Sequence, residues 1–440
     1  MNMIFIFIFI FLLLYLYQVS SDYTVLLDAG STGTRCYVYT YDKHEPFESI
    51  TEIARQRSIN AISSFVNNTI GLTDQIISLI NFAKSNVPIP NWSITSISLK
   101  ATAGLRSLSN EEQNWIISQT SSILSNSGFM FYANDTKVIS GEEEALYDFL
   151  AITIALHKNK LNNYNNMCKN CSIGAADLGG SSQQIAFAFN KNIANNNNII
   201  DEYIIDSYDT TNNNICTPDW LLGSNEILAK SLKNRGLIAA MDEVITKFYS
   251  NSCNDNINNS YCNNEDMMLH PCLSPGDTNY YEENNVEPLK GLGDFDRCLE
   301  LLKNILLEDT YFNPKCLHKH ANHPYMIIGM DNYPKILEIL KLSDKGVLSP
   351  QEIAIAGKEA CKRSWIDLLN DFPPGTPYYR TQRACFGAAY VYLMLTDVYG
   401  LNPNDKAFLA IENLGTMELS WTLGAAVIGT SESLIPTKLI

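Results

Sequence analysis

The chain has 440 residues, of which 46% are hydrophobic, and it carries a formal net charge of −16. This length and composition favour a folded protein with a large core and two lobes rather than one. The charge excludes a nucleic-acid-binding protein that works through a basic face, because no basic run offsets it. An anionic substrate would need a local cation and local backbone dipoles, since the global field repels it.

The N-terminus has the composition of a targeting segment. Residues 3–17 are nearly all Ile, Phe and Leu, and the small residues that follow suit cleavage near Asp22. We therefore expect residues 1–21 to be a signal peptide, and the protein to be secreted or to lie in the lumen of the secretory pathway. No Lys or Arg precedes the apolar stretch, so an uncleaved anchor is the alternative, and only then would a membrane be a partner.

Cysteine usage agrees with an oxidising compartment. The chain has 11 cysteines, and the odd count leaves at least one unpaired. We expect this to be Cys36, buried in an early strand. Cys168 and Cys171 form a CxxC, but no second pair at finger spacing supports zinc, so a local disulfide or distant partners are favoured. N-linked glycans are expected at the sequons of Asn67, Asn91, Asn134, Asn170 and Asn258.

The pattern of apolar residues predicts alternating strands and helices. In chain order, the expected elements are strands at 23–27 and 36–41, helices near 74–83 and 141–158, strands at 172–176 and 184–189, and helices near 225–233 and 334–342. Asn-rich stretches between them predict surface loops. Such alternation is typical of an α/β protein whose sheets are covered by helices.

The first motif is VLLDAGSTGTRCYVY, residues 25–39. A strand ends in Asp28, a Gly/Ser/Thr loop follows at residues 30–34, and a second strand begins. Such a loop can aim successive backbone N–H groups at one point and so bind an anion. It is not a Walker loop, because no Gly-Lys-Ser/Thr ending leads into a helix. An ordinary β-turn is the alternative.

The same design recurs at residues 172–189, SIGAADLGGSSQQIAFAF. A strand again ends in an aspartate, Asp177, and a Gly/Ser loop at residues 179–182 leads into another strand. Two such hairpins could grip a phosphate chain. Asp28 and Asp177 would then flank a divalent cation, Ca²⁺ or Mg²⁺, through its waters, because these ions prefer oxygen ligands. The duplication resembles the architecture of actin, heat-shock chaperones and sugar kinases.

Further segments narrow the resemblance. KATAGLR at 100–106 and ISGEEEALYDFLAI at 139–152, with the two hairpins, resemble the apyrase conserved regions of the nucleoside-triphosphate diphosphohydrolase family. The resemblance covers nearly the whole mature chain. It implies a two-lobed actin-like (ribonuclease H-like) α/β fold with an interlobe nucleotide cleft. Residues 22–140 plus 414–440 would form the N-terminal lobe, and residues 141–413 the C-terminal lobe.

The resemblance also implies roles for single residues. Glu144 matches the catalytic base, and Ser182 and Gln184 match residues that orient the attacking water. Tyr333 and Arg380 are expected to contact the nucleobase. A disulfide is implied between Cys361 and Cys385. The residues that match phosphate-binding positions are Ser31, Thr32, Gly33, Thr34, Arg35, Thr102, Ala103, Gly179, Gly180 and Ser181.

The function expected from this pattern is hydrolysis of the terminal phosphates of nucleoside tri- and diphosphates by metal-assisted attack of a Glu144-activated water. An exopolyphosphatase or another actin-like phosphotransferase is the alternative, and a catalytically inactive binding module is a third reading. The chain departs from the family's pattern at Ala145, where Gly is usual, and at Gln183, where Thr is usual. Among the adjacent glutamates, Ser140 and Glu143 have the spacing of a capping box, which leaves Glu144 for catalysis.

Overall fold

The computed structural model describes residues 22–58, 60–158, 172–190, 225–253, 268–277, 289–307, 325–376, 381–414 and 417–432. These form two compact units: unit 1 holds the described residues up to Ser140 and from Thr422 onward, and unit 2 those from Gly141 to Trp421. The expected signal peptide, the CxxC and the sequons at Asn170 and Asn258 lie outside the described residues. Within the described residues, no helix combines the length and the apolar character that crossing a membrane requires.

Unit 1 is built on a five-stranded mixed sheet in the order β3-β2-β1-β4-β5. Strands β1, β2 and β3 form an antiparallel meander, and β4 and β5 continue the sheet parallel to β1. The strands are β1 Asp22–Gly30, β2 Gly33–Tyr41, β3 Thr51–Ser58, β4 Ser96–Ala101 and β5 Thr136–Val138.

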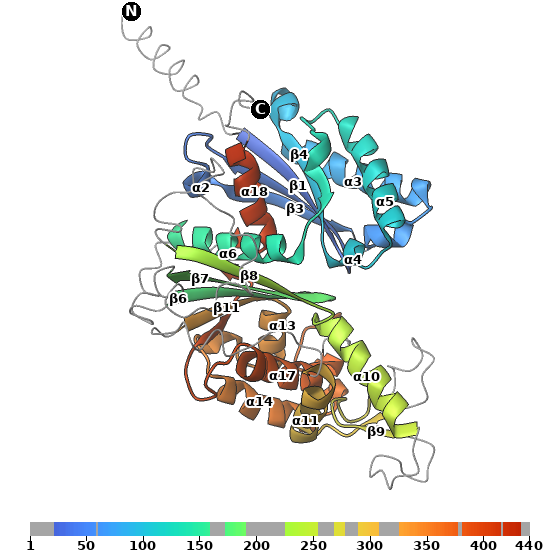
Figure 1. Ribbon diagram of the computed structural model, residues 1–440, viewed down its shortest axis with the longest axis vertical. Coiled ribbons are helices and arrows are strands. Elements are labelled where there is room, and N and C mark those ends of the chain that lie inside the picture. The colour runs from blue at the N-terminus through green and yellow to red at the C-terminus, as the bar shows by residue number, and fades with distance from the viewer. Residues whose placement is uncertain are drawn as a thin grey trace, which may run out of the picture. The chain divides into compact units, whose positions relative to one another are not determined.

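Helices cover both faces of the unit 1 sheet (Figure 1). Val25, Leu27 and Val38 share a buried cluster with α3 (Thr69–Asn86) and α5 (Asn110–Ser125), because alternate residues of a strand point to one face. On the other face, Tyr39 Oη lies 2.7 Å from Thr422 Oγ1 of α18 (Trp421–Glu432), which ties this helix to β2. Cys36 is buried and unpaired, which confirms the expectation for it.

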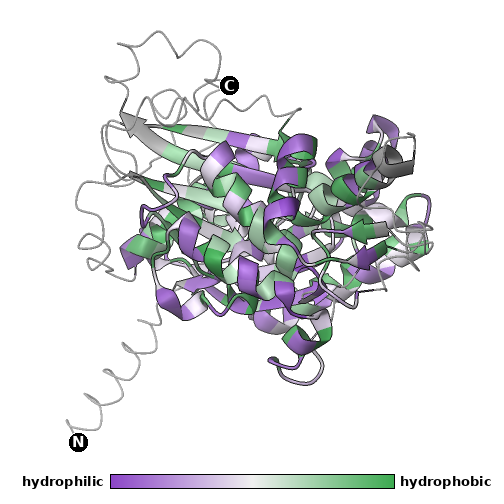
Figure 2. Cartoon of the chain, turned by 90° about the horizontal axis from the view of Figure 1, so that it is seen from below, coloured by the Kyte–Doolittle hydropathy of each residue, from purple (hydrophilic) through white to green (hydrophobic). Residues whose placement is uncertain are grey.

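Unit 2 repeats the plan with the order β12-β11-β6-β7-β8. Strands β6, β7 and β8 are antiparallel, and β11 and β12 run parallel to β6. Helix α6 lies on one face of this sheet and the remaining helices lie on the other (Figure 1). Polar and apolar residues alternate along many helices (Figure 2), as expected for helices with one face on a core. The main elements of unit 2 are β6 Ser172–Leu178, β7 Ser182–Asn190, β8 Asn225–Lys233, β11 Tyr325–Asp331, β12 Phe408–Ala410, α6 Gly141–Lys158, α10 Leu237–Cys253, α11 Phe295–Leu306, α13 Asn332–Ile339, α14 Pro350–Lys362 and α17 Ala384–Leu393.

One predicted element has the wrong type. Residues 225–233 were expected to be helical, yet they form β8, which pairs antiparallel with β7 along its whole length. The segment contains good helix formers such as Leu, Ala and Lys. Pairing with β7 and packing against α6 override this local preference, since strand propensity depends on the surface that a strand meets.

Among the described residues of unit 2, two disulfides are formed. Cys361 of α14 is bonded to Cys385 of α17, which confirms the pairing that the family resemblance implied. Cys272 is bonded to Cys298 of α11. All four cysteines are fully buried, so the two bonds lie inside the unit 2 core.

Candidate active site

The first hairpin is tighter than the sequence indicated. Strand β1 runs through Asp28 to Gly30, β2 starts at Gly33, and only Ser31 and Thr32 lie between them. Gly33 has a φ of 151°, and a Cβ there would stand 2.6 Å from the carbonyl oxygen of Ser58. Glycine is therefore required at this position, and the tip stays narrow enough to present backbone groups to an anion.

Asp28 and Arg35 form a cross-strand ion pair at the base of this hairpin. They are register partners on β1 and β2, and Arg35 Nη1 lies 3.0 Å from Asp28 Oδ2. Asp28 is 3% exposed, so the arginine supplies a countercharge to a carboxylate that burial would otherwise penalise. The guanidinium of Arg35 is thus held beside the hairpin that was predicted to bind phosphate.

The segment at residues 102–104 lies against the tip of the same hairpin. The Thr102 amide donates to the Ala29 carbonyl at 3.2 Å. A Cβ on Gly104 would stand 2.8 Å from Ser31 Cα, so only glycine allows this approach. The structure therefore brings the predicted phosphate-binding residues of unit 1 into one place.

The second hairpin is held from behind by a helix. Its tip spans residues 179–181, between β6 and β7. The amides of Leu237 and Ile238, at the start of α10, donate to the carbonyls of Gly179 at 2.9 Å and Gly180 at 3.0 Å. A Cβ on Gly236 would stand 2.4 Å from the Ser181 nitrogen. Gly236 was missed at the sequence level, because a single glycine before a helix gives no sign of the loop that it will meet.

A row of polar side chains crosses unit 2 beside this hairpin. Asp177, Gln184 and Ser231 are successive register partners on β6, β7 and β8. Gln184 Nε2 donates to Ser182 Oγ at 2.7 Å and to Ser231 Oγ at 3.1 Å. The two residues predicted to orient water therefore contact each other directly, and both are buried. Ser231 was missed because its segment was expected to be a helix.

Ser231 also fixes the start of α6. A Cβ on Gly141 would stand 2.2 Å from Ser231 Oγ, so the helix begins in close contact with β8. Three glutamates open the helix, and among them only Glu144 is buried, at 6% exposure. Asp148, one turn further along α6, is also buried. Glu144 is thus a buried carboxylate in the first turn of a helix that starts at the Gln184–Ser231 contact.

The comparisons with known proteins agree with this geometry. The model of the GDA1/CD39 (nucleoside phosphatase) family matches residues 16–439. The chain belongs to this family. A probable apyrase 3 of Arabidopsis thaliana is 27% identical over 92% of this chain and 82% of its own length. The Golgi apyrase of Saccharomyces cerevisiae is 25% identical over 94% of this chain and 71% of its own length.

Solved structures support the same fold. A nucleoside triphosphate hydrolase of Neospora caninum superposes with a TM-score of 0.66 at 13% identity, covering 94% of this chain and 93% of the other. A Ppx/GppA family member of Aquifex aeolicus superposes with a TM-score of 0.51 at 12% identity, covering 94% and 99%. Together with the two mixed sheets, these likenesses show the expected two-lobed actin-like α/β fold.

One predicted site residue of this GDA1/CD39 family member needs correction. Tyr333 was expected to contact the nucleobase, yet its side chain is fully buried in the unit 2 core. Its hydroxyl accepts a hydrogen bond from Gln183 and lies 3.3 Å from the hydroxyl of Tyr399. Burial raises the pKa of Tyr333 well above its usual range, so the hydroxyl stays protonated. Its ring has no face to offer a base, and Arg380 lies outside the described residues.

The family generally uses divalent cations, and the carboxylate oxygens of Asp28 and Asp177 are candidates for contacting one through water. The described residues contain no cluster of three or more His, Cys, Asp or Glu that could form a complete inner shell. Asp28 and Asp177 each present carboxylate oxygens beside a hairpin of backbone amides. Hard cations such as Mg²⁺ keep several waters and accept carboxylates as partners, so each aspartate, within its own unit, has the chemistry of a group that contacts a cation through water.

Proposed function

We propose that this protein is an apyrase-type phosphohydrolase that removes the terminal phosphates of nucleoside tri- and diphosphates. The observation that carries the proposal is the Ser182–Gln184 contact, which reaches Ser231 at the point where α6 begins, the helix whose first turn carries the buried Glu144. A carboxylate that can accept a proton and polar groups that can orient water, beside a glycine-rich hairpin, are the groups that phosphoryl transfer to water needs.

In the proposed mechanism, each residue has one task. Ser182 and Gln184 hold the attacking water, and Glu144 accepts its proton as the water oxygen bonds to the terminal phosphorus. The bond from that phosphorus to the bridging oxygen breaks in the same step, so that inorganic phosphate leaves and the shortened nucleotide keeps the bridging oxygen. The backbone amides of residues 31–34 and 179–181, with the Thr102–Ala103 segment, hold the phosphoryl oxygens and stabilise their developing charge. A divalent cation, when bound through water by Asp28 and Asp177, supplies further neutralisation of that charge.

We also propose that the protein enters the secretory pathway. The disulfides Cys272–Cys298 and Cys361–Cys385 support this, since such bonds persist in oxidising compartments. Asn67 and Asn134 are exposed and Asn91 is partly exposed, so glycans could be attached there. Glycosidase treatment of protein from a eukaryotic host, followed by mass measurement, tests both statements.

The activity itself is tested by phosphate release. Wild-type protein is incubated with ATP, ADP, GDP, UDP and tripolyphosphate, each with Mg²⁺, Ca²⁺ or excess EDTA. We expect cation-dependent release from the nucleotides, and none in EDTA. Release from tripolyphosphate alone would instead establish the exopolyphosphatase alternative, and no release from any substrate would indicate a binding module.

A further inference from the structure

The two units share a feature that extends beyond the hairpins. In unit 1 the register partners Asp28, Arg35 and Arg57 form a row across β1, β2 and β3. In unit 2 the corresponding row is Asp177, Gln184 and Ser231 across β6, β7 and β8. Each row starts at the hairpin aspartate and ends on the third strand of a meander. The third-strand residue of unit 2 contacts the proposed water-orienting pair, which directs attention to its counterpart in unit 1, Arg57.

Arg57 is placed where a second positive charge is costly. It lies directly opposite Arg35, and like charges at such positions destabilise an antiparallel pair. Asp28 faces Arg35 at 3.0 Å, so this row carries two guanidinium groups for one carboxylate. Arg57 is exposed, so its positive charge stands at the surface beside the first hairpin, in a chain whose net charge of −16 repels an anion elsewhere.

The side chain of Arg57 is aimed at the tip of the first hairpin. Its Nη2 donates to the Thr32 carbonyl at 3.0 Å, and its Nε lies 3.2 Å from where a Cβ on Gly33 would stand. Arg35 approaches the hairpin at Gly30, with Nη1 3.5 Å from where a Cβ there would stand. The two guanidinium groups thus reach the two glycines that bound the Ser31–Thr32 tip. Guanidinium is also the side-chain group best shaped to bind phosphate oxygens in pairs.

We infer that Arg57 binds a phosphate group of the substrate at the first hairpin and, with Arg35, relieves there the repulsion of the anion by the rest of the chain. This inference rests on the proposed function, and it adds a substrate-binding residue on β3 to it. It makes Arg57 a contributor to affinity for the phosphate chain of any substrate, with or without a nucleoside.

The test compares Arg57→Gln and Arg57→Lys with Arg55→Gln. Arg55 is an exposed arginine two residues earlier on the same strand, paired with Glu52 at 3.4 Å, and is therefore a matched control. Tripolyphosphate binding is measured by calorimetry in EDTA at constant ionic strength. We expect Arg57→Gln to weaken binding at least about tenfold, roughly 1.4 kcal/mol. Arg57→Lys should retain part of the affinity, and Arg55→Gln should stay within about twofold of wild type.

Thermal unfolding separates this role from a structural one. If Arg57 faces repulsion in the free protein, Arg57→Gln should leave the Tm in low-salt, phosphate-free buffer unchanged or raise it. If Arg57→Gln lowered the Tm and left the affinity for tripolyphosphate unchanged, Arg57 would only stabilise the hairpin, and the inference would be overturned. Phosphate release from ATP by the wild type is measured in parallel. An active wild type with equal kcat/KM for Arg57→Gln and Arg55→Gln rejects the inference alone, whereas an inactive wild type rejects the proposed function.

Discussion

The three glutamates that open α6 differ in burial, and this difference separates their roles. Glu142 and Glu143 are partly exposed, whereas Glu144 is buried. The helix begins at Gly141, so Ser140 precedes its first residue, as the capping-box prediction requires. Glu144 points about 100° around the helix from Glu143, so the two carboxylates cannot serve the same partner.

We therefore expect Glu144→Gln to lower kcat by at least about two orders of magnitude, because general-base assistance is worth roughly 10²–10⁴-fold. Its thermal stability should change little. Glu143→Ala is the control, and it should mainly lower the free energy of unfolding, by about 1 kcal/mol or less. Steady-state kinetics and urea unfolding of both variants check this. Reversed phenotypes would assign the base to Glu143.

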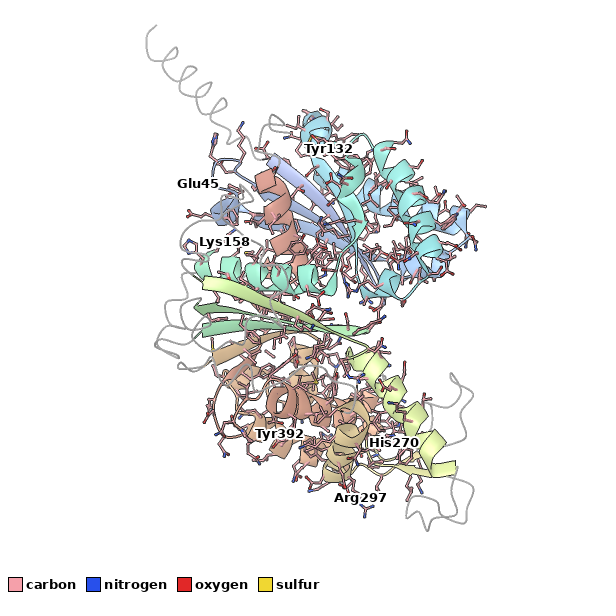
Figure 3. All side chains as sticks on the ribbon, in the orientation of Figure 1. Glu45, Tyr132, Lys158, His270, Arg297 and Tyr392 are labelled. Carbon is pink, nitrogen blue, oxygen red and sulfur yellow. A yellow bond between two sulfur atoms is a disulfide. The ribbon has the colours of Figure 1, made fainter. Side chains whose placement is uncertain are left out.

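His270 is a buried histidine whose protonation should make stability depend on pH. Its side chain is fully buried among the helices of unit 2 (Figure 3), where it meets the Phe248 ring edge-on with a centroid distance of 4.6 Å. Burial lowers the pKa of His270 to about 3. Below about pH 6.5 the imidazole is therefore protonated in the unfolded chain but stays neutral in the folded chain.

The free energy of unfolding should consequently fall as the pH falls from about 6.5 towards 3, by about 1.4 kcal/mol per pH unit from this one group. Urea unfolding at several pH values checks this. His270→Asn should be less stable at pH 7 but should show a shallower dependence. Phe248→Leu loses the ring contact but keeps the imidazole, so its free energy of unfolding should depend on pH as steeply as that of the wild type. Equal slopes for wild type and His270→Asn would contradict the assignment.

At the scale of elements, the sequence predicted correctly those helices and turns whose conformation is set by neighbouring residues in the chain. The Gly/Ser/Thr tips after Asp28 and Asp177 specify hairpins, because few other residues tolerate such turns. The bounds of α6 were predicted correctly from its apolar period and its N-terminal Ser. In contrast, β8 was predicted as a helix, and Tyr333 was predicted to contact the nucleobase. Both depend on partners far away in the chain, β7 for the strand and Gln183 with Tyr399 for the tyrosine, and no local signal encodes them.

The Cys361–Cys385 disulfide should contribute to stability through the unfolded state. The bond closes a loop with a sequence separation of 24, and its sulfurs lie in the core between α14 and α17. A loop of this size restricts the unfolded chain by about 3 kcal/mol. The double variant Cys361→Ala/Cys385→Ala should lose about that amount in urea unfolding. Cys36→Ala, which removes a buried thiol that forms no disulfide, is the control and should lose less. A free thiol at either position in peptide maps of the non-reduced protein would refute the bond.

At the scale of the whole molecule, the two units carry the same design with different chemistry. In each unit an aspartate precedes a hairpin and opens a polar row across the sheet. The row in unit 1 consists of three charged groups, whereas in unit 2 the aspartate is followed by two uncharged polar side chains. The duplication was visible in the sequence, whereas the third residue of each row was not. Strand register decides which third-strand residue joins the row, and register follows from burial of the whole strand.

This duplication leads to a prediction about the cation. If Asp28 and Asp177 serve one cation through its waters, neither can hold it alone. Asp28→Asn and Asp177→Asn should each lower kcat/KM by about two orders of magnitude or more and raise the Mg²⁺ or Ca²⁺ concentration needed for half-maximal activity. Asp28→Asn should in addition lower the free energy of unfolding by about 1–3 kcal/mol, because it leaves Arg35 without its countercharge.

The double variant decides whether the two aspartates act together. Residues that act as a unit show losses that do not multiply, since the second substitution removes what the first has already disabled. We expect Asp28→Asn/Asp177→Asn to be little worse than the poorer single variant, measured as phosphate release from ATP at saturating cation. The matched control combines Asp177→Asn with Arg57→Gln, which lies in the other unit and is proposed to bind the phosphate chain, so the losses of these two variants should multiply. If the losses at Asp28 and Asp177 also multiplied in full, each aspartate would have a separate task, and a shared cation would be wrong.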